Sequence, residues 1–354
     1  PAGRPAFTHP LPGASTPGRK GITMELAQVL DEVHADDAGK RDLLLDRDEL
    51  MLRHGRLCCP RAGGTEYAEG LTPTAWATTQ LCQRLNMPSG YFKRCPTRLQ
   101  DDQFNHWIEH AERPKRRPER WRLRVKDDTL RGVLTDRYVC LDNRDVLSTL
   151  LPMVEPRYEV GWFALTQESF HLRLTDPLLA REVLPNDRLV AGVHLANSEV
   201  GKRAVTVDAM VYRLVCSNGL VRLVHGGNLL YQRHLSWSKP RFESNLRQAV
   251  REALVHGVGF IERMSWATRV PVSDMDTAIG ALSQRWSLSQ ATETDLRQSL
   301  LDMPTGQQET LYGLVNAVTH AAQKLPADDR YDLEALAGEL VEKGLPRQTA
   351  EVLT

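Results

Sequence analysis

The chain has 354 residues, of which 41% are apolar and 25% charged, and its formal net charge is zero. This composition is typical of a globular protein, and the absence of any apolar run near the roughly 20 residues that cross a bilayer excludes a membrane span. Its six cysteines form neither a dense disulfide framework nor a paired zinc-binding pattern, which favours reduced thiols in a soluble, cytoplasmic protein.

The N-terminal third is expected to be mainly helical. Residues 1–23 are rich in Pro and Gly, and we expect a disordered extension there. Residues 24–119 are expected to form a helical region, with one acidic helical segment over 24–52. A second helix is expected to begin at Thr72 or Thr74, either of which could cap its N-terminus.

The pattern changes at Arg120 to a period of two residues, which indicates a strand with one face in the core and one in water. The apolar positions are Trp121, Leu123 and Val125, and the alternating cations are Arg122, Arg124 and Lys126. Asp127 and Asp128 then predict a turn, and Arg131 to Leu134, followed by Tyr138 to Leu141, are expected to continue as the hairpin partner. We therefore expect a row of positive charge in solvent.

Further strands follow in the same region. Phe170, Leu172 and Leu174 alternate with His171 and Arg173, which predicts another strand with a polar face.

Two apolar alternations follow, one over residues 189–195 and one over 202–216, and the polar segment Asn197–Gly201 links them. Ser217-Asn218-Gly219 predicts a turn after the second strand, because Asn-Gly favours positive φ. Pro240 suits the first turn of the next helix, whose apolar positions recur at helical spacing.

These elements predict an α+β fold: a central antiparallel β-meander followed by an amphipathic helix, with helical N- and C-terminal parts. The expected boundaries are residues 24–119, 120–268 and an acidic helical region over 269–354.

The charge is unevenly distributed. Residues 113–126 contain eight cations and one acid, whereas the chain from Pro271 onward contains thirteen acids and six bases. Such asymmetry favours a basic working surface beside an acidic tail region.

Cations at alternate strand positions recur about every 6.5 to 7 Å, close to the phosphate spacing of an extended single strand. The sequence thus predicts a surface that follows a nucleic-acid backbone, and the alternative is an ordinary solvated face. The predicted nucleic-acid-binding residues are Arg117, Arg122, Arg124, Lys126, Arg173, Lys202, Arg203 and Arg213.

Arg213 shares the parity of apolar residues in its strand, so its guanidinium is expected to point toward the apolar side. A buried guanidinium needs an acceptor, and the candidates are Glu199, Asp208 or a ligand phosphate. The alternative is a structural ion pair that closes the hairpin.

The sequence contains few residue patterns that are typical of enzyme active sites. There is no Walker pattern and no nucleophile elbow in the sequence, so no catalytic residue and no cofactor is predicted. His194, His225 and Asp208 could serve a metal-dependent nuclease, although they form no local ligand motif.

Two motifs carry a family resemblance. The runs Ala196-Asn197-Ser198-Glu199-Val200-Gly201 and Tyr212-Arg213-Leu214-Val215-Cys216-Ser217-Asn218-Gly219-Leu220 resemble the signature of the domain-of-unknown-function family numbered 932. The resemblance implies an origin in phage, plasmid or prophage-like loci, but its name implies no activity. The motif residues are Asn197, Ser198, Glu199, Gly201, Cys216, Asn218 and Gly219.

The expected element order is also similar to that of Rad-type single-strand annealing proteins, which assemble into rings and bind DNA in a basic groove; this is a fold-level analogy. We therefore expect a non-catalytic, homo-oligomeric protein that binds or anneals single-stranded DNA. The alternatives are the metal-dependent nuclease or phosphodiester hydrolase and a regulator that binds another protein of a mobile element through its acidic C-terminal helices.

Overall fold

The computed structural model describes residues 25–59, 70–110, 119–214, 218–222, 227–235 and 238–345. Within these ranges the fold is α+β, with antiparallel sheets at the centre and helices at both ends. No helix in the described ranges is long and apolar enough to cross a lipid bilayer.

The N-terminal lobe is a small sheet covered by helices. Its four-stranded sheet has the order β1-β5-β6-β4, and β2 pairs separately with β3. The strands are β1 (Lys40–Asp46), β2 (Met51–Arg53), β3 (Arg56–Cys58), β4 (Thr72–Pro73), β5 (Arg120–Lys126) and β6 (Thr129–Thr135). The helices of this lobe are α3 (Ala75–Arg84), α4 (Ser89–Phe92) and α5 (Thr97–His110), whereas α1 (Leu26–Asp37) packs its buried Val29 and Val33 against apolar residues of the central sheet.

The central sheet is the predicted meander. Its strands lie in the order β11-β10-β9-β8-β7, and β12 also pairs with β10. They are β7 (Glu159–Leu165), β8 (Phe170–Leu184), β9 (Asp187–Asn197), β10 (Val205–Arg213), β11 (Asn218–Arg222) and β12 (Leu230–Gln232), and α6 (Asn143–Leu150) precedes them.

The long helix α7 (Lys239–Ala267) covers one face of this sheet, with the predicted Pro240 in its first turn. Leu246 and Ala253 pack there against Leu172, Leu195 and other apolar residues of the strands. A Cβ at Gly257 would lie 2.9 Å from that of Ala191, so the missing side chain lets helix and sheet approach closely.

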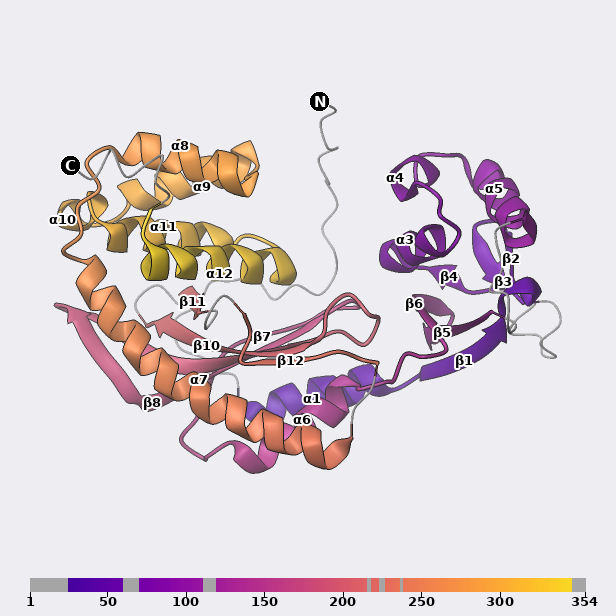
Figure 1. Ribbon diagram of the computed structural model, residues 1–354, viewed down its shortest axis with the longest axis horizontal. Coiled ribbons are helices and arrows are strands. Elements are labelled where there is room, and N and C mark those ends of the chain that lie inside the picture. The colour runs from indigo at the N-terminus through magenta and orange to yellow at the C-terminus, as the bar shows by residue number, and fades with distance from the viewer. Residues whose placement is uncertain are drawn as a thin grey trace.

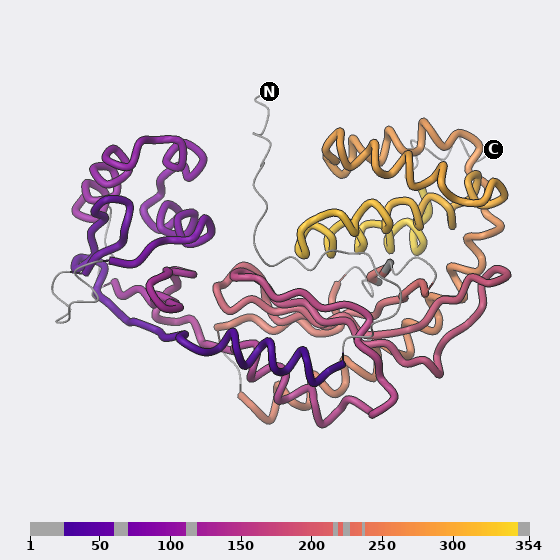
Figure 2. Tube along the Cα trace, turned by 180° about the vertical axis from the view of Figure 1, so that it is seen from behind, coloured from indigo at the N-terminus to yellow at the C-terminus, as the bar shows by residue number. Residues whose placement is uncertain are grey.

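The C-terminal helices cover the opposite face of the sheet. They are α8 (Met275–Trp286), α9 (Gln290–Leu301), α10 (Thr305–Gln308), α11 (Leu311–Ala322) and α12 (Ala327–Lys343). Figures 1 and 2 show the N-terminal lobe and these helices standing at opposite ends of the central sheet.

Several local predictions are confirmed. Thr74 caps α3, since its Oγ1 accepts a hydrogen bond of 3.1 Å from the backbone N–H of Ala77. The alternation over Trp121, Leu123 and Val125 does form a strand, and these three side chains are buried.

Other predictions are wrong. The helix expected over 24–52 ends at Asp37, because Gly39 adopts φ +76° and the following residues form β1, which pairs with β5. This sheet therefore joins residues on both sides of the boundary expected at 119/120.

The hairpin partner of β5 ends at Thr135, and Tyr138–Leu141 is not a strand. Gly219 is not in a turn either, because it lies within β11 opposite Tyr212.

Candidate functional site

The cations that alternate along β5 are paired with carboxylates of α1, of β1 and of the segment just before α6. Arg122 Nη1 lies 3.3 Å from Asp42 Oδ2, and Lys126 Nζ lies 2.7 Å from Asp36 Oδ1. Asp42 is available because β1 runs antiparallel to β5 and sets it opposite Arg124. The expectation of a row of free positive charge in solvent is therefore wrong.

Arg124 is the most deeply buried of the three, with 4% of its surface exposed. Its guanidinium donates to Asp42 Oδ1 at 3.0 Å, to Asp142 Oδ1 at 2.6 Å and to the backbone oxygen of Glu199 at 2.9 Å. Burial alone would lower the pKa of Arg124, but Asp142 and Asp42 raise it, so the side chain stays charged. Arg124 thus links β5 to the family motif.

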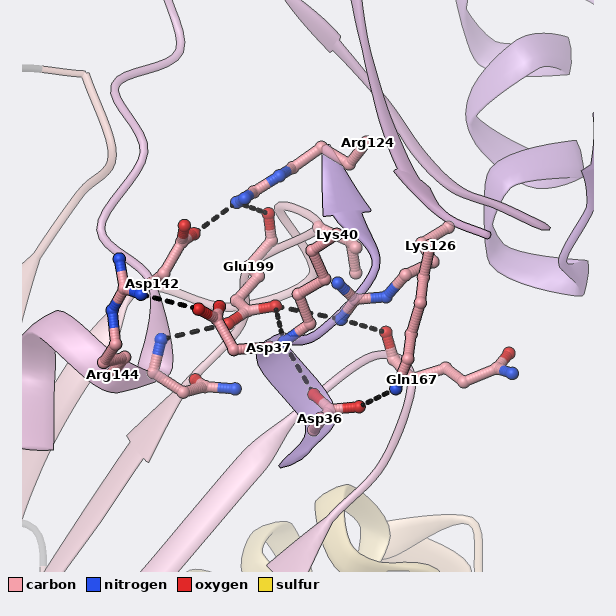
Figure 3. Close-up of polar contacts among 12 residues, drawn as sticks. Asp36, Asp37, Lys40, Arg124, Lys126, Asp142, Arg144, Gln167 and Glu199 are labelled. Carbon is pink, nitrogen blue, oxygen red and sulfur yellow. Dashed lines mark hydrogen bonds and ion pairs between the residues drawn. The ribbon is translucent and has the colours of Figure 1, made fainter. Parts of the chain in front are cut away.

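The Glu199 carboxylate lies at the centre of this network (Figure 3). Its Oε2 lies 2.9 Å from Lys40 Nζ and 3.0 Å from Arg131 Nη2, and its Oε1 accepts the backbone N–H of Asn143 at 3.0 Å. Burial alone would raise the pKa of Glu199, but Lys40 and Arg131 hold it below the usual value. The carboxylate is therefore ionised and shared between two buried cations.

The remaining motif residues shape the turn between β9 and β10. Asn197 Nδ2 donates to the backbone oxygen of Leu141 at 3.1 Å and to Asn143 Oδ1 at 2.8 Å. Ser198 Oγ accepts the backbone N–H of Lys202 at 3.0 Å, which closes the turn. These side chains bind the protein's own backbone and amides.

The backbone of the turn also holds helix α3. The oxygen of Val200 accepts from Trp76 Nε1 at 3.0 Å and from Gln80 Nε2 at 2.8 Å. Gly201 adopts φ +75°, and a Cβ there would lie 2.7 Å from a methyl group of Leu134. The segment Asn197–Gly201, together with Lys40, Arg124 and Arg131, therefore joins the N-terminal lobe to the meander, and we call it the joint.

The polar face of the meander is buried under α12, contrary to the expectation that it faces water. His171 Nδ1 lies 3.1 Å from His194 Nε2, and His171 Nε2 lies 3.0 Å from Asp328 Oδ1 on α12. Burial lowers the pKa of both histidines, most strongly that of His194, so the pair is neutral.

Arg173 is also buried on this face, where it pairs with both carboxylate oxygens of Glu334 from α12. The indole of Trp162 stacks on the guanidinium groups of Arg173 and Arg330, at 4.6 and 4.5 Å from ring centroid to Cζ. A Cβ at Gly219 would lie 2.4 Å from Arg173 Nη1, so this motif glycine makes room for the arginine.

His194 and Asp208 lie opposite each other on β9 and β10, but other side chains satisfy the aspartate. Asp208 accepts from the Tyr331 hydroxyl and from Asn228 Nδ2, each at 2.8 Å. Burial raises the pKa of Asp208 to about 6. His225 lies outside the described residues, and among those described no group of three or more His, Cys, Asp or Glu is arranged to hold a metal ion.

Lys202 and Arg203 follow the joint and contact α12. Lys202 Nζ lies 2.5 Å from Glu168 Oε2 and 3.0 Å from Asp328 Oδ2, while Arg203 Nη2 lies 3.0 Å from Asp328 Oδ1. Arg203 also stacks on Tyr331. Both cations are therefore neutralised by acids of the chain.

Arg213 points toward the apolar side of β10, as the alternation predicts. Its acceptor is Asp187, with Nη2 to Oδ2 at 2.5 Å, and not Glu199 or Asp208. The Tyr312 hydroxyl donates to the same carboxylate at 2.8 Å. This is the structural ion pair between the two strands that the sequence left open as an alternative.

The other predicted site residues lie outside the described residues or next to a gap in them. Arg117 and Cys216 lie outside the described residues, and Asn218 is the first residue of β11.

A set of cations that the sequence analysis did not single out is free. Arg241, Arg247 and Arg251 occupy exposed positions of α7, and we call them the basic row. Across the described ranges no carboxylate pairs with any of the three. The signal was present in the sequence, because they occupy polar positions of the helical period that identifies α7.

Comparison with known proteins matches the chain to a protein family. A family model with the description "Domain of unknown function (DUF932)" matches residues 130–326, more than half of the chain. Neither the curated proteins nor the solved structures yield a match. The match includes the whole meander, the joint segment Asn197–Gly201 and α7.

Proposed function

Since this chain belongs to the DUF932 family, whose description names no activity, we propose a function from its surface: it binds single-stranded nucleic acid through the basic row of α7. Single-stranded DNA is the expected ligand. The observation that carries this proposal is the absence of carboxylate partners for Arg241, Arg247 and Arg251 within the described chain.

The spacing of the basic row suits a phosphate backbone. With a rise of about 1.5 Å per residue, Arg241 and Arg247 are separated by about 9 Å along the helix axis, and Arg247 and Arg251 by about 6 Å. These separations are of the same order as the distance between neighbouring phosphates of an extended single strand. The arginines contact phosphates rather than bases, so binding is largely independent of sequence.

The ion pairing elsewhere in the chain supports this location. A phosphate that approached Arg124 or Arg173 would compete with carboxylates already in place at Asp142 and Glu334. The arginines of the basic row face no such competition. The gain in free energy from releasing condensed counterions is therefore available at α7.

The wider proposal is that the protein anneals complementary strands as a homo-oligomer in the cytoplasm. A strand held by its phosphates keeps its bases free to pair, and two copies of the chain can bring two such strands together. Size-exclusion chromatography with and without single-stranded DNA measures the oligomeric state that this proposal requires.

The test replaces Arg241, Arg247 and Arg251 together by glutamine and measures binding of a labelled single-stranded oligonucleotide by fluorescence anisotropy over a range of salt concentrations. Each lost phosphate contact reduces the slope of log K against log salt by about 0.7, so we expect a reduction of about 2. We also expect the variant to bind the oligonucleotide with lower affinity than wild type at low salt.

The matched control replaces three other exposed arginines that lie apart from one another. These are Arg53 on β2, Arg181 on β8 and Arg285 on α8. The control variant has the same net charge as the test variant, so a general charge effect lowers both equally. Equal loss in both variants, or none in the test variant, contradicts the assignment of the site to α7.

A further inference from the structure

An open pocket lies where the C-terminal ends of α7 and α12 meet. Its volume is about 450 Å³, within the range of small-ligand sites, and its walls include Glu262, Arg263 and Trp266 from α7 and Glu342 and Lys343 from α12. The Trp266 side chain is 51% exposed, so a large part of its indole surface is open to a ligand.

The polar groups of this pocket are mixed in charge. Arg263 Nη1 lies 3.6 Å from Glu342 Oε2 across the pocket, and Lys343 pairs with Glu339 at 2.8 Å. Both helices also end here, and a helix C-terminus presents carbonyl oxygens and a partial negative charge. The pocket is therefore unsuited to a phosphate.

The pocket suits a planar aromatic group with both donors and acceptors on its edge. A nucleobase is such a group: its ring stacks on indole, its amino group donates to a carboxylate, and its carbonyl or ring nitrogen accepts from a guanidinium. Around Trp266, the exposed Glu262 offers an acceptor, and Arg263, which is half exposed and 3.6 Å from Glu342, offers a donor.

The pocket is also in line with the basic row. Trp266 lies on the same exposed side of α7 as Arg251 and about 22 Å farther along the helix axis. An extended strand bound along the row covers that distance within a few nucleotides.

We infer that this pocket receives one base of the bound single strand, stacked on Trp266. The inference rests on the proposed function and adds to it a binding site for a base that carries an amino group beside a carbonyl or ring nitrogen, as cytosine, guanine and adenine do. The phosphates lie on the basic row, and the base at Trp266 anchors one end of the bound segment.

The experiment compares fluorescein-labelled oligodeoxycytidine with an abasic oligonucleotide of equal length, using wild-type protein, Trp266→Ala and Trp266→Phe. Wild type is expected to prefer the base-containing strand about tenfold, the effect of one base–aromatic stack. Trp266→Ala is expected to lose this preference, and Trp266→Phe to retain part of it. Trp107→Ala, which removes an exposed tryptophan from α5, should preserve it.

The outcomes separate the two claims. If wild type binds the oligonucleotide and Trp266→Ala keeps the full preference, the base pocket is wrong and the proposed function stands. If wild type binds neither strand at low salt, both are wrong. Thermal melting of Trp266→Ala establishes that the variant is folded, as expected for a half-exposed side chain.

Discussion

The Glu199 carboxylate faces two buried cations, Lys40 and Arg131, inside the joint. When one member of a buried ion pair is removed, the other remains desolvated without a partner, and this costs more than the net worth of the pair. The two cations come from β1 and β6, so removing the Glu199 carboxylate weakens the contact between the N-terminal lobe and the meander.

Glu199→Gln is expected to lower the free energy of unfolding by about 3 to 5 kcal/mol, because the amide leaves the buried Arg131 without a carboxylate and leaves Lys40 with Asp36 alone. Urea denaturation followed by circular dichroism measures the change. Glu109→Gln, at an exposed position of α5, serves as the control and should change the stability by less than about 0.5 kcal/mol. A loss below about 1 kcal/mol in Glu199→Gln would show that the network is not a stabilising joint.

The sequence predicts toward which side a single side chain points, but not with which residue it pairs. The parity of Arg213 correctly predicts that it points to the apolar side, because side chains alternate along any strand. Its acceptor, Asp187, could not be predicted, since the pairing depends on how far the β9–β10 hairpin extends and on its register. The family motif likewise marked Glu199 without indicating that Lys40, far away in the sequence, would contact it.

At the scale of elements, alternation predicts which side chains share a face but not what covers that face. Arg122 and Arg124 follow the expected alternation along β5, yet β1 pairs with this strand and supplies Asp42. The polar face of β8 is likewise covered when α12 brings Asp328 and Glu334 to it. Each covering element is distant in the sequence, so the local periodicity of the strand cannot predict it.

The stability that the contact between the meander and α12 provides should depend on pH. His171 and His194 have pKa values lowered by burial, so both take up protons on unfolding once the pH falls below about 6.5. The unfolded state then binds more protons, and stability decreases as the pH falls. Asp208, with its pKa raised to about 6, acts in the opposite direction at lower pH but contributes only one proton.

His194→Gln is therefore expected to flatten this dependence. Each such histidine contributes up to about 1.4 kcal/mol per pH unit, so between pH 6 and pH 5 the variant should lose about that much less stability than wild type. Urea denaturation at the two pH values measures the difference. Parallel losses in variant and wild type would mean that His194 does not titrate on unfolding.

At the scale of the whole molecule, the zero net charge does not show that many acids and bases pair with each other inside the protein. Two acids of the C-terminal region, Asp328 and Glu334, neutralise Arg203 and Arg173 of the meander. The cations of β5 are neutralised in the same way by Asp36, Asp42 and Asp142. The basic row stays outside these pairings, at exposed positions of α7.

The measurement that tests the central claim most directly is an equilibrium titration of a labelled single-stranded oligonucleotide with the intact wild-type protein at a low and a high salt concentration. We predict binding at low salt that weakens steeply at high salt, because cations on α7 displace counterions from phosphates. Failure to bind at low salt, or binding with the same affinity at both concentrations, would contradict the account.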